Sequence, residues 1–326
     1  MGEDLSDLGE FEVIRRLLAR LPEAELIVPP GDDTALVTTG PETLATSDLL
    51  VEGRHFDLAF SSPADVGFKA LSVNVSDIAA MGGRPRYALL SVGAPAATAV
   101  ASLEALYDGV AEAALAYGVV VAGGDTVGTD QIIISVAMIG EPGAGGVVRR
   151  SGARPGDLLC VTGELGAAAA GLALLRAAGS DGAASALAER FPNLIVAHRR
   201  GNARAREGEA VAVAGARAMI DVSDGLLADA GHLCERSGVG VLVDAHEVPR
   251  APGVDEVEEW SGSAGIALSG GDDYELCFAI APDDLDEATR ALAPTAVTVV
   301  GRFVEGSGVD VSGAPAPSTH GWDGFR

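Results

Sequence analysis

Residues 141–157 form a stretch rich in glycine and proline that divides the chain into two parts, each with its own apolar patterning. This stretch, EPGAGGVVRRSGARPGD, has no apolar period, and such segments commonly connect domains. On both sides of it, short apolar runs typical of strands alternate with longer segments whose apolar residues recur at helical spacing. We therefore expect an α/β protein of mixed α+β type with two domains, over residues 1–145 and 146–326.

Helix and strand signals place the elements within each part. Pro63 is a favoured first residue of a helix, and Gly82-Gly83 is a typical helix end. In the first part we expect helices at 9–20, 64–81 and 98–117, and strands at 34–38, 43–50, 86–93, 119–122 and 131–139. In the second part we expect strands at 158–162, 218–222, 239–244, 274–280 and 296–304, and helices at 165–178, 183–190, 207–216, 224–237 and 283–291.

Composition limits the kind of core and the kind of partner. Hydrophobic residues make up 48% of the 326 residues but aromatic residues only 4%, so the cores must be built from Ala, Val, Leu and Ile. The formal net charge of -25 repels nucleic acids and anionic lipid surfaces, and it attracts cations. We therefore expect neither a nucleic acid nor a membrane as a partner.

Cysteine usage and the N-terminal sequence bear on the cellular compartment. Cys160, Cys234 and Cys277 have no metal-binding spacing, and an odd number of cysteines does not make a disulfide framework. The N-terminal MGEDLSDLGE is acidic and lacks the apolar centre of a signal peptide, and no apolar run approaches about 18 residues. These features predict a cytoplasmic protein.

Several common catalytic motifs are absent from the sequence. No GxxxxGK[ST] phosphate-binding loop occurs, and Lys69, the one lysine, lies inside a predicted helix. The protein-kinase motif set, a GxSxG nucleophile motif and a clean GxGxxG after a strand are also missing. The sequence therefore argues against P-loop, serine-hydrolase and dinucleotide-binding enzymes.

What recurs instead is an aspartate beside glycine or serine at the ends of predicted elements. Carboxylates are hard oxygen ligands suited to Mg²⁺, and neighbouring glycines let a phosphate or an ion approach the backbone. The six motifs are GDDT (31–34), TSD (46–48), NVSD (74–77), GGDT (123–126), DVSDG (221–225) and GGDD (270–273).

Each motif taken alone also has a structural interpretation. Asp224 would be well placed to cap the helix predicted at 224–237. Lys69, Val73 and Asp77 share one helix face at four-residue spacing, which is equally consistent with a solvated face. Spacing alone does not show that the aspartates converge, but converging carboxylates would repel one another and require cations.

These motifs, in this order, resemble the thiamine-monophosphate kinase family, in the superfamily that also contains aminoimidazole ribonucleotide synthetase, selenophosphate synthetase and the hydrogenase-maturation dehydratase. The matching stretches span nearly the whole chain, and the ordered set is highly specific. They are GEFEVI (9–14), GDDTAL (31–36), TSDLLVEGRHF (46–56), FKALSVNVSDIAAMGG (68–83), VAGGDT (121–126), RSGARPGD (150–157), DVSDGL (221–226), SGGDDYEL (269–276) and GWDGF (321–325).

The resemblance implies a fold, an assembly and a reaction. It implies two α/β domains, a homodimer whose N-terminal domains share a β-barrel, and an active site completed by the C-terminal domain. The implied reaction transfers the γ-phosphate of ATP to thiamine monophosphate, giving thiamine diphosphate and ADP, with several Mg²⁺ ions. A phosphate acceptor is already anionic at neutral pH, so aspartates that hold magnesium suit this reaction better than a strong general base.

The resemblance also assigns roles to individual residues. The implied magnesium ligands are Asp33, Thr46, Ser47, Asp48, Asp77, Asp125, Asp221 and Asp224. The implied ATP contacts are Tyr117, Gly124, Asp125, Arg150 and Ser223. The implied contacts to thiamine phosphate are His55, Asp272 and Trp322, and the residues expected to matter most for catalysis are Asp48, Asp125, Arg150 and Asp224. His55 could also be an ordinary strand-end residue, and Trp322 a C-terminal anchor.

The chain departs from the family pattern at three positions. Asp272 stands where the family usually has Glu, which puts the substrate role of this position in question. Ser47 precedes Asp48 where the family often has Thr, a chemically conservative change. Gly324 stands where the C-terminal pattern usually has His, so the edge of the substrate pocket is expected to differ.

Two other classes of function compete with this hypothesis. One is another enzyme of the superfamily, but no cysteine precedes Cys160, as selenophosphate synthetase would require, and the chain lacks the Cys-bearing tail of the hydrogenase-maturation enzyme. Aminoimidazole ribonucleotide synthetase lacks the EGRHF and GWDGF motifs. The second class is a non-catalytic dimer that binds nucleotide or divalent ions, against which the intact set of aspartate motifs argues.

Overall fold

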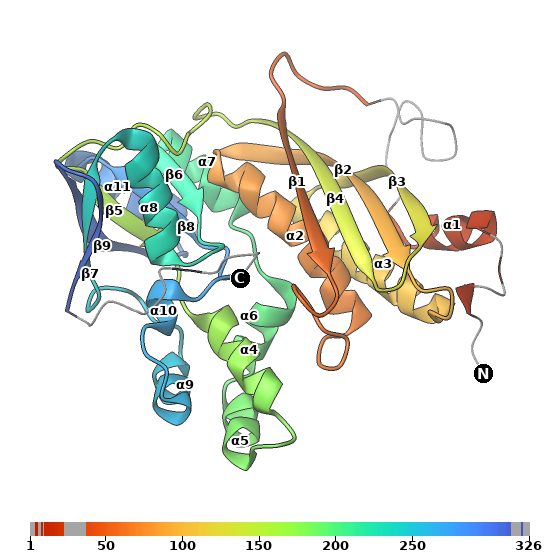
Figure 1. The fold of residues 1–326 in the computed structure, drawn as a ribbon. Helices are drawn as coiled ribbons and strands as arrows, with labels where there is room; N and C mark the ends of the chain where they lie inside the picture. Colours follow the sequence, from red (N-terminus) through yellow and green to blue (C-terminus); the bar gives the residue numbers. More distant parts are fainter. Residues whose placement is uncertain (1–3, 6–7, 9, 23–36, 314–320, 322–326) are drawn as a thin grey trace. The chain divides into compact units, whose positions relative to one another are not determined.

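The computed structural model describes residues 4–5, 8, 10–22, 37–313 and 321. Contacts divide the chain into two compact units (Figure 1). Unit 1 comprises Met1–Ile78 and Arg84–Glu141, and unit 2 comprises Ala79–Gly83 and Pro142–Arg326. Each unit combines one β-sheet with helices, so the predicted mixed α/β class with two parts is confirmed.

Unit 1 contains an open four-stranded sheet. The strand order is β1-β4-β2-β3, with β1 antiparallel to β4 and β2 parallel to β3. The strands are β1 (Leu44–Val51), β2 (Gly83–Ala94), β3 (Val120–Gly128) and β4 (Ile133–Pro142). The edges of this sheet are therefore β1 and β3, which carry two of the predicted aspartate motifs.

Two long helices, α2 (Pro63–Ala80) and α3 (Val100–Tyr117), cover one face of this sheet (Figure 1). Their backbones nearly touch where they cross. A Cβ atom on Gly67 would lie 1.9 Å from the carbonyl oxygen of Leu106, and one on Gly109 would lie 1.8 Å from that of Ala64. Only glycine permits this approach. The short helix α1 (Glu10–Leu18) contacts α3.

Helix α2 is buried along most of its length, which corrects one interpretation of the sequence. Lys69 is 2% exposed and Val73 is 7% exposed, so Lys69, Val73 and Asp77 do not form a solvated face. The Lys69 ammonium donates to the carbonyl oxygen of His55 at 3.4 Å. The lysine therefore ties α2 to the turn that follows β1.

Unit 2 contains a six-stranded mixed sheet with the strand order β10-β7-β9-β5-β8-β6. Strands β10 and β7 run parallel, and the other neighbouring pairs run antiparallel. The strands are β5 (Leu158–Thr162), β6 (Ala218–Asp221), β7 (Gly240–Asp244), β8 (Leu276–Ile280), β9 (Val297–Val304) and β10 (Gly308–Ser312).

Helices pack on both faces of this sheet, so its central strands are buried on both sides. Helix α8 (Leu226–Ser237) packs on one face, and α7 (Ala205–Val213) and α11 (Leu285–Leu292) pack on the other. Strand β8 shows the alternation: Cys277 and Ala279 face α8, whereas Leu276, Phe278 and Ile280 face the opposite core. Aliphatic residues dominate both cores, as composition predicts.

The other helices of unit 2 gather around α4, which contacts α5, α6, α9 and α10. They are α4 (Ala167–Ala177), α5 (Gly182–Arg190), α6 (Pro192–Arg200), α9 (Val254–Ser261) and α10 (Ile266–Ser269). No helix among the described residues is long and apolar enough to cross a membrane.

Most predicted elements are present with ends shifted by a few residues. The sequence interpretation missed α6, α9, α10 and β10. Only Phe191 separates α5 from α6, so the sequence gives no clear signal for a second helix there. Strand β10 has only five residues, which are exposed or partly exposed. The strand predicted at 34–38 falls partly outside the described residues, and residues 37–38 are not in a strand.

Candidate active site

In unit 1, the residues Thr46 and Asp48 lie on the side of β1 that faces α2. Leu50, two residues further on, is buried on the same side, whereas Ser47 alternates to the exposed side. The Thr46 hydroxyl donates a hydrogen bond to the Asp77 carboxylate of α2. The Asp48 N–H donates to the side-chain oxygen of Asn74 at 3.1 Å. Strand β1 and helix α2 thus bring three of the predicted ligands together.

These carboxylates fit a divalent cation. Burial and, to a smaller extent, the charge of the neighbouring Asp77 carboxylate together raise the pKa of Asp48 to about 6. A partly buried carboxylate beside a second one is costly when both are charged, and a cation offsets that cost. Hard carboxylate and hydroxyl oxygens are the ligands that Mg²⁺ prefers.

Gly124 and Asp125 lie on β3, the opposite edge of the same sheet. Asp125 pairs in register with Ser91 of β2, is exposed, and accepts a hydrogen bond from the Thr126 N–H at 2.8 Å. A Cβ atom on Gly124 would lie 1.8 Å from the carbonyl oxygen of Leu90, so only glycine fits. Two strands separate β3 from β1, a distance of about 14 Å across the sheet. Asp125 and Asp48 of one chain therefore do not share an ion.

His55 and Tyr117 both have defined intramolecular partners in unit 1. The Val51 N–H donates to Nδ1 of His55 at 3.0 Å, which places the proton of the neutral imidazole on Nε2. The Tyr117 hydroxyl lies 3.0 Å from the Ser72 hydroxyl of α2, and its ring centroid lies 5.9 Å from that of Phe68. The end of α3 is thus fastened to α2 by the residue that was predicted to contact ATP.

In unit 2, the predicted residues Asp221, Ser223 and Asp224 lie on the loop between β6 and α8. Asp221 is 3% exposed at the end of β6. Asp224 does not cap α8, contrary to the structural interpretation of the sequence. The helix begins at Leu226. Its N-cap residue is Gly225, so no side chain at the N-cap position bonds to the helix. The backbone N–H groups of this loop bond instead to Asp229, from within the first turn of α8.

A second loop, residues 270–274, packs directly on this one. The Asp272 N–H donates to the Ser223 carbonyl at 2.8 Å, and the Tyr274 N–H donates to the Val222 carbonyl at 2.9 Å. A Cβ atom on Gly271 would lie 2.4 Å from the Ser223 oxygen. The structure therefore brings Asp221, Ser223, Asp224 and Asp272 together in one region of unit 2.

The backbone of Asp272 explains why aspartate suits this position. Its φ is 69°, in the left-handed region, and Tyr274 has a φ of 54°. Short polar side chains such as Asp tolerate this region better than longer ones, because they can hydrogen-bond locally. The Tyr274 hydroxyl donates to Oδ1 of Asp272 at 2.8 Å and holds the side chain.

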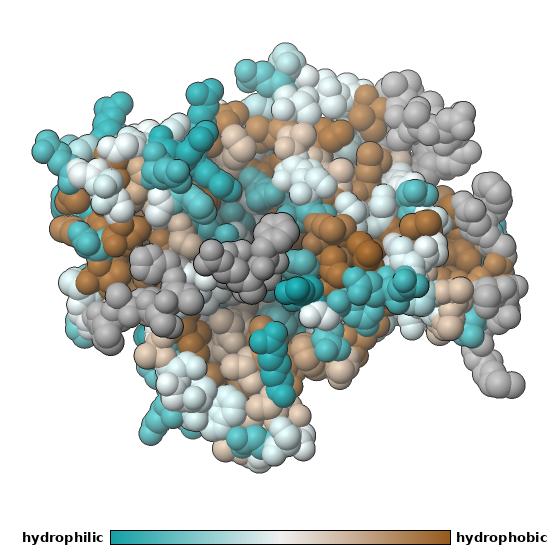
Figure 2. Space-filling view, viewed as in Figure 1, coloured by the Kyte–Doolittle hydropathy of each residue, from teal (hydrophilic) through white to brown (hydrophobic). Residues whose placement is uncertain are grey.

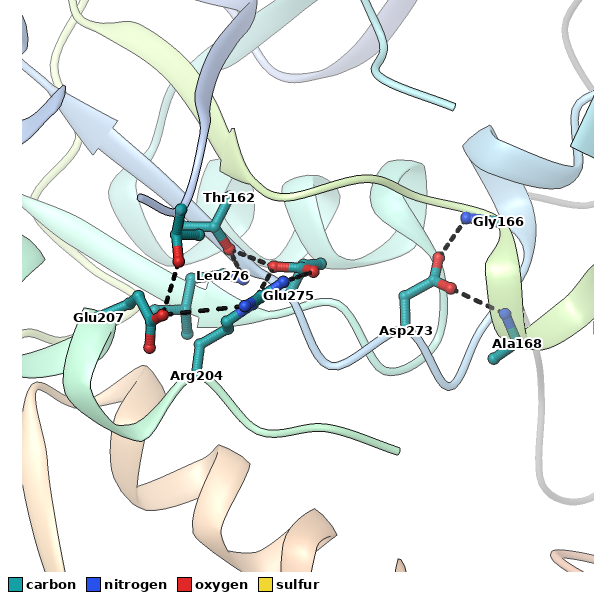
Figure 3. Close-up of polar contacts among 9 residues, drawn as sticks. Thr162, Gly166, Ala168, Arg204, Glu207, Asp273, Glu275 and Leu276 are labelled. Carbon is teal, nitrogen blue, oxygen red and sulfur yellow. Dashed lines mark hydrogen bonds and ion pairs between the residues drawn. The ribbon is translucent and has the colours of Figure 1, made fainter. Parts of the chain in front are cut away.

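The partly buried carboxylate of Asp273 and the buried carboxylate of Glu275 anchor the second loop to neighbouring segments of unit 2 (Figure 3). Asp273 accepts from the N–H groups of Gly166 at 2.6 Å and Ala168 at 3.1 Å, at the start of α4. Burial raises the pKa of Asp273 to about 7 despite these bonds. Glu275 accepts from the Thr162 hydroxyl at 2.6 Å and from Nε of Arg204 at 2.7 Å. Burial raises the pKa of Glu275, and the Arg204 guanidinium opposes that rise.

The sequence interpretation gave no role to Asp229, Glu275 or Arg204. Glu275 lies inside the SGGDDYEL motif, which is a signal that could have drawn attention to it. Arg204 lies 71 residues from Glu275, and no sequence pattern links the two. Asp229 lies one helical turn beyond Gly225, where a side chain can reach back to the loop.

One group of three potential metal ligands is present among the described residues. Ligand atoms of Asp224, Asp229 and His232 lie within 4.8 Å of one another. Burial, together with the smaller effects of the Asp221 and Asp224 charges, raises the pKa of Asp229 to about 8. The crowding of carboxylates favours a cation on this loop, and oxygens outnumber the single imidazole, which suits Mg²⁺.

The remaining predicted residues are not tied to either aspartate cluster by a contact among the described residues. Arg150 is exposed, and its carbonyl oxygen accepts from the Ser237 hydroxyl at 3.4 Å. Asp33 and Trp322 lie outside the described residues. Gly321, which precedes Trp322, lies against the first loop, since a Cβ atom on it would be 2.7 Å from the Asp224 carbonyl oxygen.

Comparisons with known proteins identify relatives along nearly the whole chain. The family model described as AIR synthase related protein, N-terminal domain, matches residues 31–141, and the corresponding C-terminal domain model matches 154–313. The thiamine-monophosphate kinase of Mycobacterium tuberculosis (strain ATCC 25618 / H37Rv) is 39% identical over 331 aligned residues, covering 98% of this chain and 93% of that protein.

Solved structures agree with the sequence comparison. The crystal structure of thiamine-monophosphate kinase from Stenotrophomonas maltophilia K279a has a TM-score of 0.82 and 37% identity, covering 95% of this chain and 98% of that one. The structure of AaThiL complexed with AMPPCP and TMP has a TM-score of 0.75 and 36% identity, covering 98% of both chains. The chain therefore belongs to the AIR synthase-related family and, within it, to the thiamine-monophosphate kinases.

Proposed function

We propose that the chain transfers the γ-phosphoryl group of ATP to the phosphate of thiamine monophosphate, giving thiamine diphosphate and ADP. The observation that carries this proposal is the full-length similarity to thiamine-monophosphate kinases, one of which forms a complex with AMPPCP, an ATP analogue, and TMP. The aspartate residues of both units support it. Their oxygens are suitable ligands for the Mg²⁺ ions that two polyanionic reactants require.

In this proposal the aspartates hold several Mg²⁺ ions, which would neutralise the negative charge of the reacting phosphates. Thr46, Ser47, Asp48 and Asp77 would act in unit 1 together with Asp33, and Asp221 and Asp224 would act in unit 2. Ser47 faces away from Asp48, so its contribution would come through the backbone carbonyl rather than the hydroxyl. Asp125 lies on the other edge of the sheet and would serve a different ion from Asp48.

The remaining residues would bind the two substrates. Gly124 would contact ATP through its backbone, because the Leu90 carbonyl oxygen fills the space beside its α-carbon, and the exposed Arg150 guanidinium can pair with a phosphate. Ser223 would use only its hydroxyl, because its N–H and its carbonyl are both engaged within the protein. Tyr117 would contact ATP through its ring, and His55, Asp272 and Trp322 would contact the thiamine phosphate.

We also propose that the protein is a homodimer in which two copies of the unit 1 sheet close into a shared barrel. Large apolar side chains are exposed on the face of this sheet away from α2 and α3: Leu49 is 53%, Leu89 is 44% and Val127 is 62% exposed. Figure 2 shows hydrophobic surface over the sheet of unit 1. The edge strands β1 and β3 also leave backbone groups that pairing would satisfy.

A direct assay tests the proposed reaction. ATP, Mg²⁺ and thiamine monophosphate are incubated with the protein, the products are separated by chromatography, and thiamine serves as a parallel acceptor. Thiamine diphosphate formed only from the monophosphate is the expected result. Absence of product with ATP still bound would contradict the proposal and direct attention to ADP and phosphate release from a ribonucleotide amide, or to a non-catalytic nucleotide-binding dimer.

A further inference from the structure

Three successive backbone N–H groups in the loop before α8 point at one carboxylate. The N–H groups of Ser223, Asp224 and Gly225 lie 3.1, 3.1 and 3.0 Å from Oδ2 of Asp229. Asp229 is 1% exposed. Successive N–H groups that converge in this way form a concave site for an anion, of the kind that binds phosphate in other proteins. Here the protein's own carboxylate fills that site.

This arrangement determines which groups the loop can offer to a ligand. With its N–H groups engaged, the loop has no backbone donors left for a phosphate. The Ser223 carbonyl accepts from the Asp272 N–H at 2.8 Å, so the hydroxyl is the remaining polar group of that residue. The acidic side chains here are the partly exposed Asp224 and the buried Asp221 at the end of β6, and carboxylates suit a cation.

The loop is also confined by close backbone contacts at Gly225 and Gly271. Gly225 has a φ of 120°, and a Cβ atom on it would lie 2.7 Å from the backbone of Ser269. A Cβ atom on Gly271 would lie closer still, 2.4 Å from the Ser223 carbonyl oxygen. Asp229 is thus the internal partner that sets the loop's position between α8 and the second loop.

We propose that Asp229 is a positioning residue that holds Ser223 and Asp224 in place for cation binding beside Asp221 and keeps the loop from binding phosphate through its backbone. The inference rests on the proposed function for the identity of the cation, Mg²⁺. Although Asp229 lies in the group of three potential metal ligands, its Oδ2 is engaged by three backbone N–H groups, and it acts through the loop's backbone. Loss of an outer partner of this kind typically lowers metal affinity or activity by about 10- to 100-fold.

The test compares Asp229→Ala, Asp229→Asn and a matched control, Asp181→Ala. Asp181 also accepts two backbone N–H bonds at a helix start, from Ala183 and Ala184 of α5, but it has no part in the proposed site. Metal binding is read from the EPR signal of free Mn²⁺ in the presence of a non-hydrolysable ATP analogue. Thiamine diphosphate formation is measured in parallel as a function of Mg²⁺ concentration, and thermal melting without metal checks the fold.

Asp229→Ala is expected to weaken Mn²⁺ binding and raise the half-saturating Mg²⁺ concentration by about 10- to 100-fold. Sodium formate, a carboxylate small enough for the vacated space, should restore Mn²⁺ binding in this variant, whereas sodium chloride at equal ionic strength should not. Asp229→Asn keeps the shape but not the charge, so its loss should be smaller. Asp181→Ala should keep wild-type metal binding with a lower melting temperature.

Wild-type Mn²⁺ affinity in Asp229→Ala would overturn the inference. If that variant does not fold, Asp229→Asn decides, and wild-type affinity there would overturn it equally. Failure of the proposed function has a different signature. In that case the wild-type protein makes no thiamine diphosphate, while the Mn²⁺ titrations still report whether Asp229 controls cation binding.

Discussion

The hydroxyl of Thr46 on β1 donates a hydrogen bond to the carboxylate of Asp77 on α2, across 31 residues of sequence. This bond joins the edge strand of unit 1 to the buried helix that crosses the sheet. It also orients two predicted magnesium ligands toward each other before any metal binds. The geometry of this corner is therefore a property of the folded chain, and substitutions at Thr46 should reveal its contribution to stability.

Replacing Thr46 by valine keeps the shape of the side chain and removes the hydroxyl. Because the acceptor is a carboxylate in a partly buried position, we expect the free energy of unfolding to fall by about 1–3 kcal/mol. Urea unfolding without metal measures this change. Thr46→Ser retains the hydroxyl and is the control, so equal losses in both variants would contradict the assigned role of the hydrogen bond.

The raised pKa of Asp48 predicts a pH dependence of stability in the metal-free protein. Between the ordinary value of 3.8 and the folded value of about 6, the folded state binds more protons than the unfolded state. The contribution of Asp48 to the free energy of unfolding is therefore greatest at low pH, and it falls as pH rises through that window. Asp48→Asn removes the titration, so the variant should gain about 2 kcal/mol relative to the wild type between pH 4 and pH 7.

Urea unfolding of both proteins over this pH range, with a chelator present, measures the difference. Added Mg²⁺ should stabilise the wild type at pH 7 more than the Asn variant, because binding to the folded state offsets the repulsion between carboxylates. Turnover should be abolished in Asp48→Asn although its metal-free form is more stable. A constant difference in stability across the pH range would show that Asp48 does not titrate as inferred.

Local sequence patterns predicted most elements of the fold because apolar periodicity and helix-breaking residues are local signals. Pro63 and Gly82 mark the ends of α2 correctly to within two residues. Long-range relationships were not accessible in this way. Nothing local shows that strand order places Asp125 on the edge opposite Asp48, or that Arg204 pairs with Glu275.

The same limit applies within the site. The sequence supported helix capping by Asp224, but the loop turns so that its N–H groups face Asp229 instead. That choice depends on Gly225 at a φ of 120° and on the packing of the second loop. A single aspartate in a motif does not reveal whether its side chain caps a helix or points toward a ligand, because both outcomes use the same residue types.

Asp125→Asn should separate catalysis from stability. Asp125 is exposed on β3 and bonds only locally to the Thr126 N–H in the described structure, so the free energy of unfolding should change by less than about 0.5 kcal/mol. If Asp125 holds a magnesium ion, turnover should fall by about 100-fold or more. Asp130→Asn, an exposed aspartate between β3 and β4, is the control and should keep wild-type turnover. Normal turnover in Asp125→Asn would remove this residue from the proposed site.

The proposed homodimer predicts that charge on the exposed sheet face prevents self-association. Leu49 is 53% exposed on β1, and an aspartate there would be desolvated if two sheets closed into a barrel. Leu49→Asp should therefore shift the protein from dimer to monomer in sedimentation equilibrium, while far-UV circular dichroism stays unchanged. Leu115 on α3, 71% exposed on the helical side of unit 1, is the matched control, and Leu115→Asp should remain dimeric. A monomeric wild type, or equal effects of the two substitutions, would place the interface elsewhere.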